Sequence, residues 1–550
     1  MGEVPMTAEA ATWRGPALVV AGLLSILVLV CASCERNVAD LADSEISTYL
    51  QAESLGYDFD LEIGDGDRLR SVAQFGEDVF EPPSTSAQGG GGQRFDHPRT
   101  YTLLLAPFVR MAGPRGAAIF NALMLALAAW VAMRRLGTSF GSQAALVIIL
   151  FLFATVTYRA VFLIRPHVFL LTTVVCAMAL ALRFEEPGVH HLREIYRPPP
   201  AVVNITLTWL AIGLLAGVVA TYHPLYLVLL LPLAMQIPTD HRKWGLMALL
   251  VGTTVLILLD PPDIQRFVGS RFDVGLSTWS LIYLAVGRNI GLLPYFLPVV
   301  IALGWIGGTK RRTSFWLSVL VAGVGFALLE PFDLFDGPAA VGNGWLLPLT
   351  GALWFVPSRP VPRQWIWIAA ACSALTMLPT WAAPNIDLVT PAKTYRHSSG
   401  WLNQWLPVET TQRDLPAGGE RMGRGLWVRS SSAAAEPTED GGWQLEGNQR
   451  AELTIASPAQ IGSLYLQFGP QAEPELEVRG GQLGNMVLAP DGGIGFQIED
   501  LDRRALHPMW WSGEKHHVYV ITIRMPQPGS PKTQMFTVRA FGPEFGASDP

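Results

Sequence analysis

The residues best suited to chemistry in this chain form an acidic cluster just after its first apolar run. The run covers residues 15–33, and Asp40, Asp43 and Glu45 follow it. If the run crosses a bilayer, these carboxyl groups lie just outside the hydrocarbon, where crowded like charges are costly and more often functional than decorative. Acids held at a fixed depth beside a membrane can act on a substrate whose tail lies in the lipid.

The acids begin a segment with the pattern of a surface helix. Residues 43–56 place four apolar side chains at helical spacing, namely Ile46, Tyr49, Leu50 and Leu55. Asp40 or Asp43 could serve only as the cap of this helix, because a carboxylate accepts hydrogen bonds from the free amides at a helix start. The local sequence leaves both interpretations of Asp43 open.

Eleven apolar blocks predict a polytopic α-helical membrane protein. Hydrophobic residues make up 50% of the chain and charged residues only 15%. The apolar residues gather in blocks near the length that crosses about 30 Å of hydrocarbon. The blocks are 15–33, 115–136, 142–160, 161–182, 201–221, 223–238, 244–260, 291–308, 314–330, 343–357 and 365–382. The divisions at 160/161 and 221/223 are the least distinct, because those helix pairs are nearly continuous.

Basic residues fall in every second connection between the blocks. Arg134-Arg135 and Arg242-Lys243 are examples, and the positive-inside rule puts such connections on the cytoplasmic side. The connections predicted outside are 35–98, 260–290 and 330–342. The C-terminal part then also lies outside. Residues 15–33 could instead be the core of a cleaved signal peptide, but the length of the run favours a retained span.

A second domain is predicted over residues 385–550, after a transmembrane domain over 1–384 with a long first outer loop at 35–114. Short alternating segments replace the apolar blocks there, and turn residues separate them at intervals of roughly 8 to 12 residues. This pattern predicts an all-β sandwich of the jelly-roll or carbohydrate-binding-module type. Trp510-Trp511 could stack on a sugar or pack inside the sandwich.

Several other functional classes leave no motif in the sequence. It contains no Walker loop, no Gly-rich dinucleotide fingerprint after a strand and no His-Glu-x-x-His. The net charge is −6 and no basic stripe faces outward. These observations argue against nucleotide cofactors and against nucleic acid as a partner.

Four segments resemble motifs of the GT-C superfamily of integral-membrane glycosyltransferases. Residues 42–52 resemble its acidic motif after the first span. Residues 94–101 resemble the end of the same loop in bacterial members that use polyprenyl-phosphate sugars. Residues 287–295 and 342–349 are similar to two later motifs of that bacterial group.

The resemblance implies an inverting transfer of a sugar from a polyprenyl-phosphate carrier. The acceptor would be a glycan, lipid or protein, and the site would lie at the outer face of a bacterial inner membrane. Such a reaction needs a general base within reach of the acceptor hydroxyl. We expect Asp43 in this role, with Glu45 as the second candidate.

The leaving phosphate in this reaction needs cationic partners, and Arg can offer it two parallel hydrogen bonds. The candidates expected near the outer surface are Arg288, Arg165, His97 and Arg99, with Tyr49 of the surface helix beside the substrate. Arg288 and Arg165 could instead extend their head groups to water or pair with the acidic cluster. His97 could simply shape a turn.

The sequence leaves metal dependence and activity open. Asp43, Glu45 and His167 offer the donor types that a divalent metal takes, and only some members of the superfamily use a metal. Gly344-Trp345 stands where an Arg-aromatic pair is expected, and Pro166-His167 stands where an acid is expected. If these departures abolish activity, the chain is a non-catalytic scaffold or sugar-binding subunit. A secondary transporter is a further alternative, which would need ionisable groups near the bilayer midplane.

Overall fold

The computed structural model describes the chain in segments. The described residues are 7–33, 41, 43–60, 62–75, 95, 98–140, 143–182, 202–262, 281, 284–286, 291–305, 310–329, 344, 346–357, 361–382, 420–422, 426–430, 435–437, 443–445, 450–457, 461–468, 477–479, 481–488, 494–499, 501, 503–505, 517–524 and 534–541. They belong to two compact units, one mostly before residue 388 and one mostly after it. The predicted boundary at 384/385 lies outside the described residues and stays a prediction.

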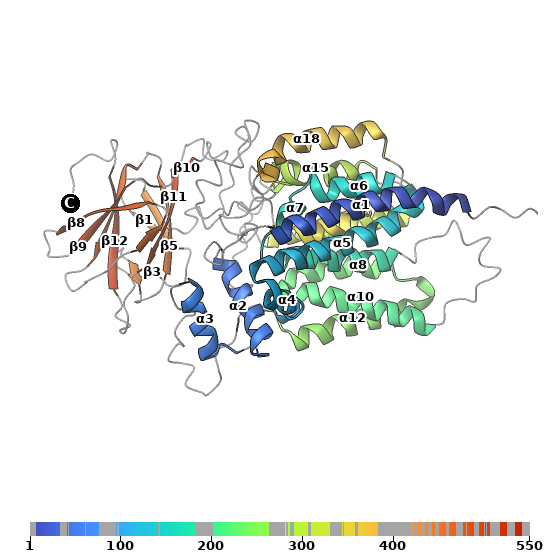
Figure 1. The fold of residues 1–550 in the computed structure, drawn as a ribbon, viewed down its shortest axis with the longest axis horizontal. Helices are drawn as coiled ribbons and strands as arrows, with labels where there is room; N and C mark the ends of the chain where they lie inside the picture. Colours follow the sequence, from blue (N-terminus) through green and yellow to red (C-terminus); the bar gives the residue numbers. More distant parts are fainter. Residues whose placement is uncertain are drawn as a thin grey trace, which may run out of the picture. The chain divides into compact units, whose positions relative to one another are not determined.

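The first unit is built from apolar helices (Figure 1). Its longer helices are α1 (Thr7–Ser33), α5 (Pro114–Phe140), α6 (Gln143–Phe153), α8 (His167–Leu182), α10 (Val202–Tyr222), α12 (Arg242–Leu259), α15 (Leu292–Leu303), α16 (Lys310–Leu329), α17 (Leu347–Leu353) and α18 (Arg363–Ala382). The shorter helical segments are α7 (Thr157–Ala160), η4 (Pro224–Leu229), α11 (Leu230–Met235) and η5 (Thr239–His241). Helices α1, α5, α8, α10 and α12 pack in series, each against the next.

Three helical stretches among the described residues are long and apolar enough to cross a membrane. They are Pro114–Gly137, Val203–Tyr222 and Thr239–Leu259. Each of the eleven predicted blocks contains helix, but several helices are shorter than their blocks. Block 343–357, for example, contains only α17. The membrane-type helical fold is therefore present, while the number of spans stays a prediction.

The chain breaks its helices at both of the indistinct block divisions. Residues 154–166 form turns on either side of the single-turn helix α7. At the second division His223 is extended, with φ −154° and ψ 119°. Its Nδ1 accepts a hydrogen bond from the Leu225 N–H at 3.3 Å, so the imidazole caps η4.

Three further helices lie outside the apolar blocks. They are α2 (Asp43–Tyr57), α3 (Asp65–Phe75) and α4 (Arg99–Ala112). Helix α2 confirms the helix predicted over 43–56, but the prediction that it lies along the surface was wrong, because its polar residues Glu45, Gln51 and Glu53 are buried. Helix α2 packs against α3 and α4, and α4 packs against α5. Figure 1 shows α2, α3 and α4 beyond one end of α5 and α8.

Two glycines allow α4 to fold back closely on α5. Gly113 has φ +57°, in the left-handed region that favours glycine, and its N–H donates to the Val109 carbonyl at 2.7 Å. A Cβ on Gly116 would lie 1.9 Å from the Phe108 carbonyl oxygen. No larger residue fits at Gly116 unless the two helices separate.

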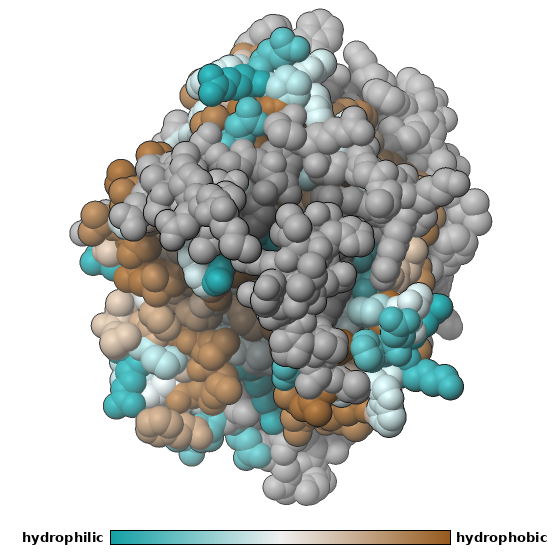
Figure 2. All heavy atoms as spheres, turned by 90° about the vertical axis from the view of Figure 1, so that its right-hand side faces the viewer, coloured by the Kyte–Doolittle hydropathy of each residue, from teal (hydrophilic) through white to brown (hydrophobic). Residues whose placement is uncertain are grey.

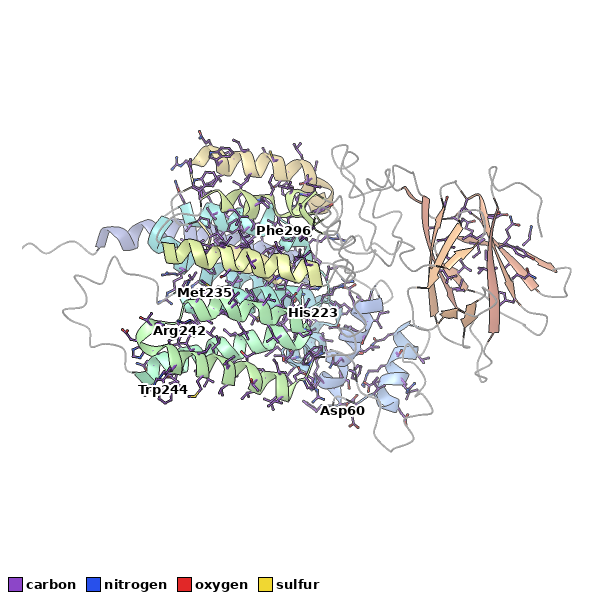
Figure 3. The ribbon with its side chains drawn as sticks, turned by 180° about the vertical axis from the view of Figure 1, so that it is seen from behind. Asp60, His223, Met235, Arg242, Trp244 and Phe296 are labelled. Carbon is purple, nitrogen blue, oxygen red and sulfur yellow. The ribbon has the colours of Figure 1, made fainter. Side chains whose placement is uncertain are left out.

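The two ends of the helical unit carry different residues. Figure 3 places His223 toward the end with α2 and Asp60, while Arg242 and Trp244 lie toward the opposite end. The basic pair Arg242-Lys243 therefore lies at the end opposite α2, as the alternation of connections predicts. Which end faces the cytoplasm stays a prediction.

Large apolar side chains are exposed along the outer faces of the helices. On α12 they are Trp244, Leu246, Met247, Leu250, Val251, Val255, Leu258 and Leu259. Figure 2 shows broad hydrophobic areas on the face that it presents. Continuous apolar surface of this kind is costly in water, so it favours contact with lipid.

The second unit consists of two antiparallel sheets. The strands are β1 (Glu420–Met422), β2 (Leu426–Ser430), β3 (Ala435–Pro437), β4 (Trp443–Leu445), β5 (Arg450–Ser457), β6 (Ser463–Phe468), β7 (Glu477–Arg479), β8 (Gln482–Leu488), β9 (Ile494–Glu499), β10 (Arg503–Ala505), β11 (His517–Arg524) and β12 (Gln534–Phe541). One sheet has the order β1-β2-β5-β11-β10, with β7 also pairing with β11, and the other has the order β3-β4-β12-β6-β9-β8.

The strand register agrees with the alternation in the sequence. Strands β5 and β11, which cover alternating segments of the sequence, pair along their whole length, from His517 opposite Ser457 to Arg524 opposite Arg450. In β6 every second residue is buried, as in a strand with one face on a core. The packing of the two sheets as a sandwich stays a prediction. Trp510-Trp511 lies outside the described residues.

Candidate functional site

Glu45 of the acidic cluster contacts the segment between α6 and α8, called here the α6–α8 connection (residues 154–166). Glu45 lies in the first turn of α2, and its side chain is fully buried. Its Oε1 accepts a hydrogen bond from the backbone N–H of Ile164 at 2.6 Å. A buried carboxylate requires such a donor, because its removal from water is otherwise costly. Glu45 therefore ties the start of α2 to the α6–α8 connection.

A buried amide on α5 holds the same connection from another side. Nδ2 of Asn121 donates to the carbonyls of Val161 and Leu163 at 3.3 and 2.8 Å. Oδ1 of Asn121 accepts from the hydroxyl of Tyr101 on α4 at 3.2 Å. Burial raises the pKa of Tyr101, and the nearby negative charge of Glu45 adds to the rise. These contacts place Tyr101, Asn121 and Glu45 around one short stretch of backbone.

One of the later sequence motifs also reaches the α6–α8 connection. The backbone N–H of Val156 donates to the carbonyl of Tyr295 at 3.0 Å. Tyr295 ends the motif at 287–295 and lies in α15, which departs from helical geometry at Phe296 (φ −133°, ψ 22°; Figure 3). The segments 42–52 and 287–295, which are distant in sequence, thus both contact residues 154–166, and Tyr101 is linked to the same residues through Asn121.

The α6–α8 connection leads directly into two predicted site residues. Arg165 and His167 are buried, with 6% and 3% of their surfaces exposed. His167 is the first residue of α8, where the backbone amides of a helix start favour negative charge. Glu45 accepts its hydrogen bond from Ile164, the residue directly before Arg165. This bond therefore brings the carboxylate to the backbone beside that arginine.

The start of α4 carries the next predicted residue, Arg99. Its side chain is exposed, and its backbone N–H donates to Oδ2 of Asp260 at 2.8 Å. The Tyr101 N–H donates to the Tyr222 hydroxyl at 2.7 Å, and that hydroxyl donates to the Pro98 carbonyl at 3.3 Å. These bonds fix the first turn of α4 on the ends of α10 and α12 and leave the Arg99 guanidinium accessible.

Tyr49 lies at the interface of α2 with its neighbours rather than at an open surface. It is buried, as is Glu53 one turn later in α2, and Oε1 of Glu53 accepts a hydrogen bond from Gln74 of α3 at 2.8 Å. Burial raises the pKa of Glu53, against the opposing effects of the Gln74 hydrogen bond and the charge of Arg70. Burial also raises the pKa of Tyr49. This setting favours a packing role for Tyr49, and its predicted substrate contact stays a prediction.

Three predicted site groups lie outside the described part of the chain. His97 and Arg288 are outside the described residues, and Asp43 is described only as the first residue of α2, without its side chain. Among the residues that the structure describes, no group of three His, Cys, Asp or Glu side chains could hold a metal. The predicted metal ligands Asp43, Glu45 and His167 include the Asp43 side chain, which the structure does not describe. This metal site therefore stays a prediction.

Sequence patterns did not single out Asn121, Tyr222 or Asp260, which position the described site residues. Asn121 offered the clearest signal, because a lone amide inside an apolar block is costly unless it is bonded. Asp260 and Tyr222 end apolar blocks, where polar residues are common. Their roles depend on backbone groups of α4, which leave no pattern in the sequence.

The arrangement gathers acidic and cationic groups at one end of an apolar helical unit. Glu45 in the first turn of α2 lies beside the backbone that carries Arg165 and His167. Such a site can accept a proton from a hydroxyl and stabilise an anionic leaving group.

Comparisons with known proteins give a weak structural likeness. No family model matches the chain, and no curated protein matches it. The structure of ArnT from Cupriavidus metallidurans bound to undecaprenyl phosphate is similar with a TM-score of 0.41 and 16% identity, over 69% of this chain and 67% of that chain. The apo structure of the same protein gives 0.42 and 16%, over 70% and 68%.

Proposed function

We propose that the chain is a membrane glycosyltransferase that moves a sugar from a polyprenyl-phosphate carrier to an acceptor hydroxyl. The observation that carries this proposal is the hydrogen bond from the Ile164 N–H to Glu45. It brings the acidic start of α2 to the backbone next to Arg165 and His167. A proton acceptor and phosphate-binding cations beside an apolar helical unit are what a lipid-phosphate donor requires.

In this proposal Asp43 is the general base. The acceptor oxygen attacks the anomeric carbon, the bond from that carbon to the phosphate oxygen breaks, and the phosphate leaves with the electron pair. The acceptor proton passes to the Asp43 carboxylate. Glu45 is less suited to this step, because it is buried and already accepts a backbone hydrogen bond. We assign Glu45 to positioning the α6–α8 connection.

The leaving phosphate would be stabilised by cationic side chains. Arg165 borders the bonded Ile164, and Arg99 is exposed at the start of α4. Either guanidinium can form two parallel hydrogen bonds to phosphate oxygens. His97 and Arg288 complete the proposed set from the sequence.

The C-terminal unit is proposed to be a β-sandwich on the same side of a bacterial inner membrane as the site. Supporting this, the hydroxyl of Tyr519 in β11 accepts from the N–H of Ile461, which precedes β6 in the other sheet, at 2.9 Å. Core residues of both sheets are buried, including Leu453, Ile521 and Leu466. A domain of this type would bind the glycan acceptor.

A transfer assay with labelled polyprenyl-phosphate sugars in membranes tests the proposal. Asp43→Asn should lower the transfer rate by 10²- to 10⁴-fold, in line with the loss of a general base. The control is Asp65→Asn, which changes an exposed acid in the first turn of α3 and should retain the activity. Full transfer by Asp43→Asn would remove that residue as the base. Solute uptake in proteoliposomes without sugar transfer would favour a transporter.

A labelling experiment tests the orientation. In a cysteine-free background, a cysteine at Ser430 in β2 should react with an impermeant reagent in intact cells, whereas one at Lys243 at the start of α12 should be protected. The opposite pattern would invert the topology and place the acids inside the cell.

A further inference from the structure

The proposed transfer reaction leaves Arg110, near the end of α4, without a role. Its Cζ lies 5.7 Å from the ring centroid of Tyr57 and 5.7 Å from that of Phe59. One guanidinium nitrogen donates to the Gly56 carbonyl at 2.9 Å. Within the described part of the chain no carboxylate pairs with it. Since a guanidinium has five N–H donors, most of this cation is open to a ligand from outside.

Phe59 is held in an unusual position beside that cation. Its φ is +60°, just past the end of α2, where the N–H groups of Asp58 and Phe59 both donate to the Ser54 carbonyl. Glycine is favoured in this left-handed position, and a side chain there costs about 1 kcal/mol. The ring is 77% exposed, so it adds little to the core. A strained and exposed aromatic residue suggests a contact outside the protein.

The chain order fixes the depth of Arg110 relative to the membrane. Helix α4 leads through Gly113 into Pro114, which begins a helix long and apolar enough to cross a membrane. Arg110 is therefore only four residues before the start of a predicted span. Aromatic rings and cations gather at this level, where lipid headgroups meet the hydrocarbon.

The exposed face of α4 is apolar and continues the surface of a neighbouring span. Leu103, Leu104 and Met111 are 60%, 45% and 75% exposed. The first turn of α4 is bonded to Asp260, directly after the exposed Leu259 of α12. A helix with this face lies naturally in the interface of a bilayer.

We propose that Arg110, held by Tyr57 and Phe59, binds the phosphate of an anionic bilayer lipid. The apolar face of α4 lies among the acyl chains of the same leaflet. A guanidinium can donate two parallel hydrogen bonds to phosphate oxygens, and aromatic rings such as those of Tyr57 and Phe59 are common at the depth of the lipid headgroups. The binding position is separate from the proposed transfer site, because Tyr101 lies about 14 Å away along the axis of α4.

Lipid retention by the purified full-length protein tests the proposal. Native mass spectrometry after incubation with phosphatidylglycerol or phosphatidylcholine would give the ratio of the two retained lipids. Arg110→Gln should lower this ratio about fivefold, the usual contribution of one cation near an anionic surface. Phe59→Ala should also lower it, while the exposed position of this ring keeps the fold intact. The control is Arg115→Gln, which removes an exposed cation five residues later.

The outcomes separate a specific site from general electrostatics. Losses in Arg110→Gln and Phe59→Ala, with little change in Arg115→Gln, would support the site. Equal losses in both arginine variants would show that any cation at this level suffices, and would overturn it. Unchanged retention in Arg110→Gln and Phe59→Ala would leave Arg110 as a clamp on the end of α2 alone. Stronger Arg110-dependent retention of a polyprenyl phosphate than of phosphatidylglycerol would assign the residue to the carrier and also overturn the proposal.

Discussion

Substitutions of Glu45 separate two roles that this carboxylate could have. If it positions the α6–α8 connection, any side-chain oxygen that accepts from the Ile164 N–H preserves its function. If it is the base, only an ionisable group does. Glu45→Gln keeps an acceptor oxygen and removes the titratable group, whereas Glu45→Ala removes both.

The magnitudes follow from the buried 2.6 Å bond between Ile164 and Glu45. Replacing a charged acceptor with a neutral one should cost about 1 kcal/mol. Alanine would leave the Ile164 N–H without its partner, which costs about 1–3 kcal/mol before any cavity is counted. A positioning role therefore predicts transfer within about fivefold of wild type for Gln and a much larger loss for Ala.

Transfer rates and thermal unfolding in detergent should be measured on the same preparations of both variants. A loss beyond about 100-fold in Glu45→Gln, in a protein that unfolds at the wild-type temperature, would refute the positioning role. It would instead identify Glu45 as the base, since loss of a general base costs about 10²- to 10⁴-fold. Asp43→Asn should then retain its activity, which provides an internal check.

Two further predictions concern pH and packing. Burial raises the pKa of Glu53 above its usual value of 4.5. The folded state therefore favours the protonated acid, so the docking of α3 on α2 should weaken as the pH rises from 4.5 through the raised pKa. Glu53→Gln should remove this pH dependence from limited proteolysis between α2 and α3; an identical pH profile would contradict the assignment. Gly116→Ala should lower the unfolding temperature, at a cost of about 2 kcal/mol or more, because its Cβ would meet the Phe108 carbonyl. Gly323→Ala, whose Cβ meets nothing within 4 Å, is the matched control, and an equal loss in both would show that the close approach of α4 and α5 is not responsible.

The sequence by itself determined the secondary structure well, because its signals are local. Blocks of apolar residues place the helices, and alternation in 450–457 and 517–524 gives two strands that pair along their length. A helix over 43–56 was predicted from four apolar positions and is present as α2, but its expected place on the surface was wrong, because its polar residues Glu45, Gln51 and Glu53 are buried as well. Lengths were less certain, since block 343–357 folds only in part into α17.

Only the tertiary structure decided how the site residues are held. The partner of Glu45 is a backbone amide 119 residues away, and that of Asn121 is a pair of backbone carbonyls. Backbone groups are the same at every residue, so no pattern of residue types marks them as partners. The same holds for Arg110. The rings of Tyr57 and Phe59 belong to the end of α2, and they lie beside Arg110 only because α2 packs on α4. Local patterns thus fixed which residues are available, and the close approach of distant segments fixed which of them act together.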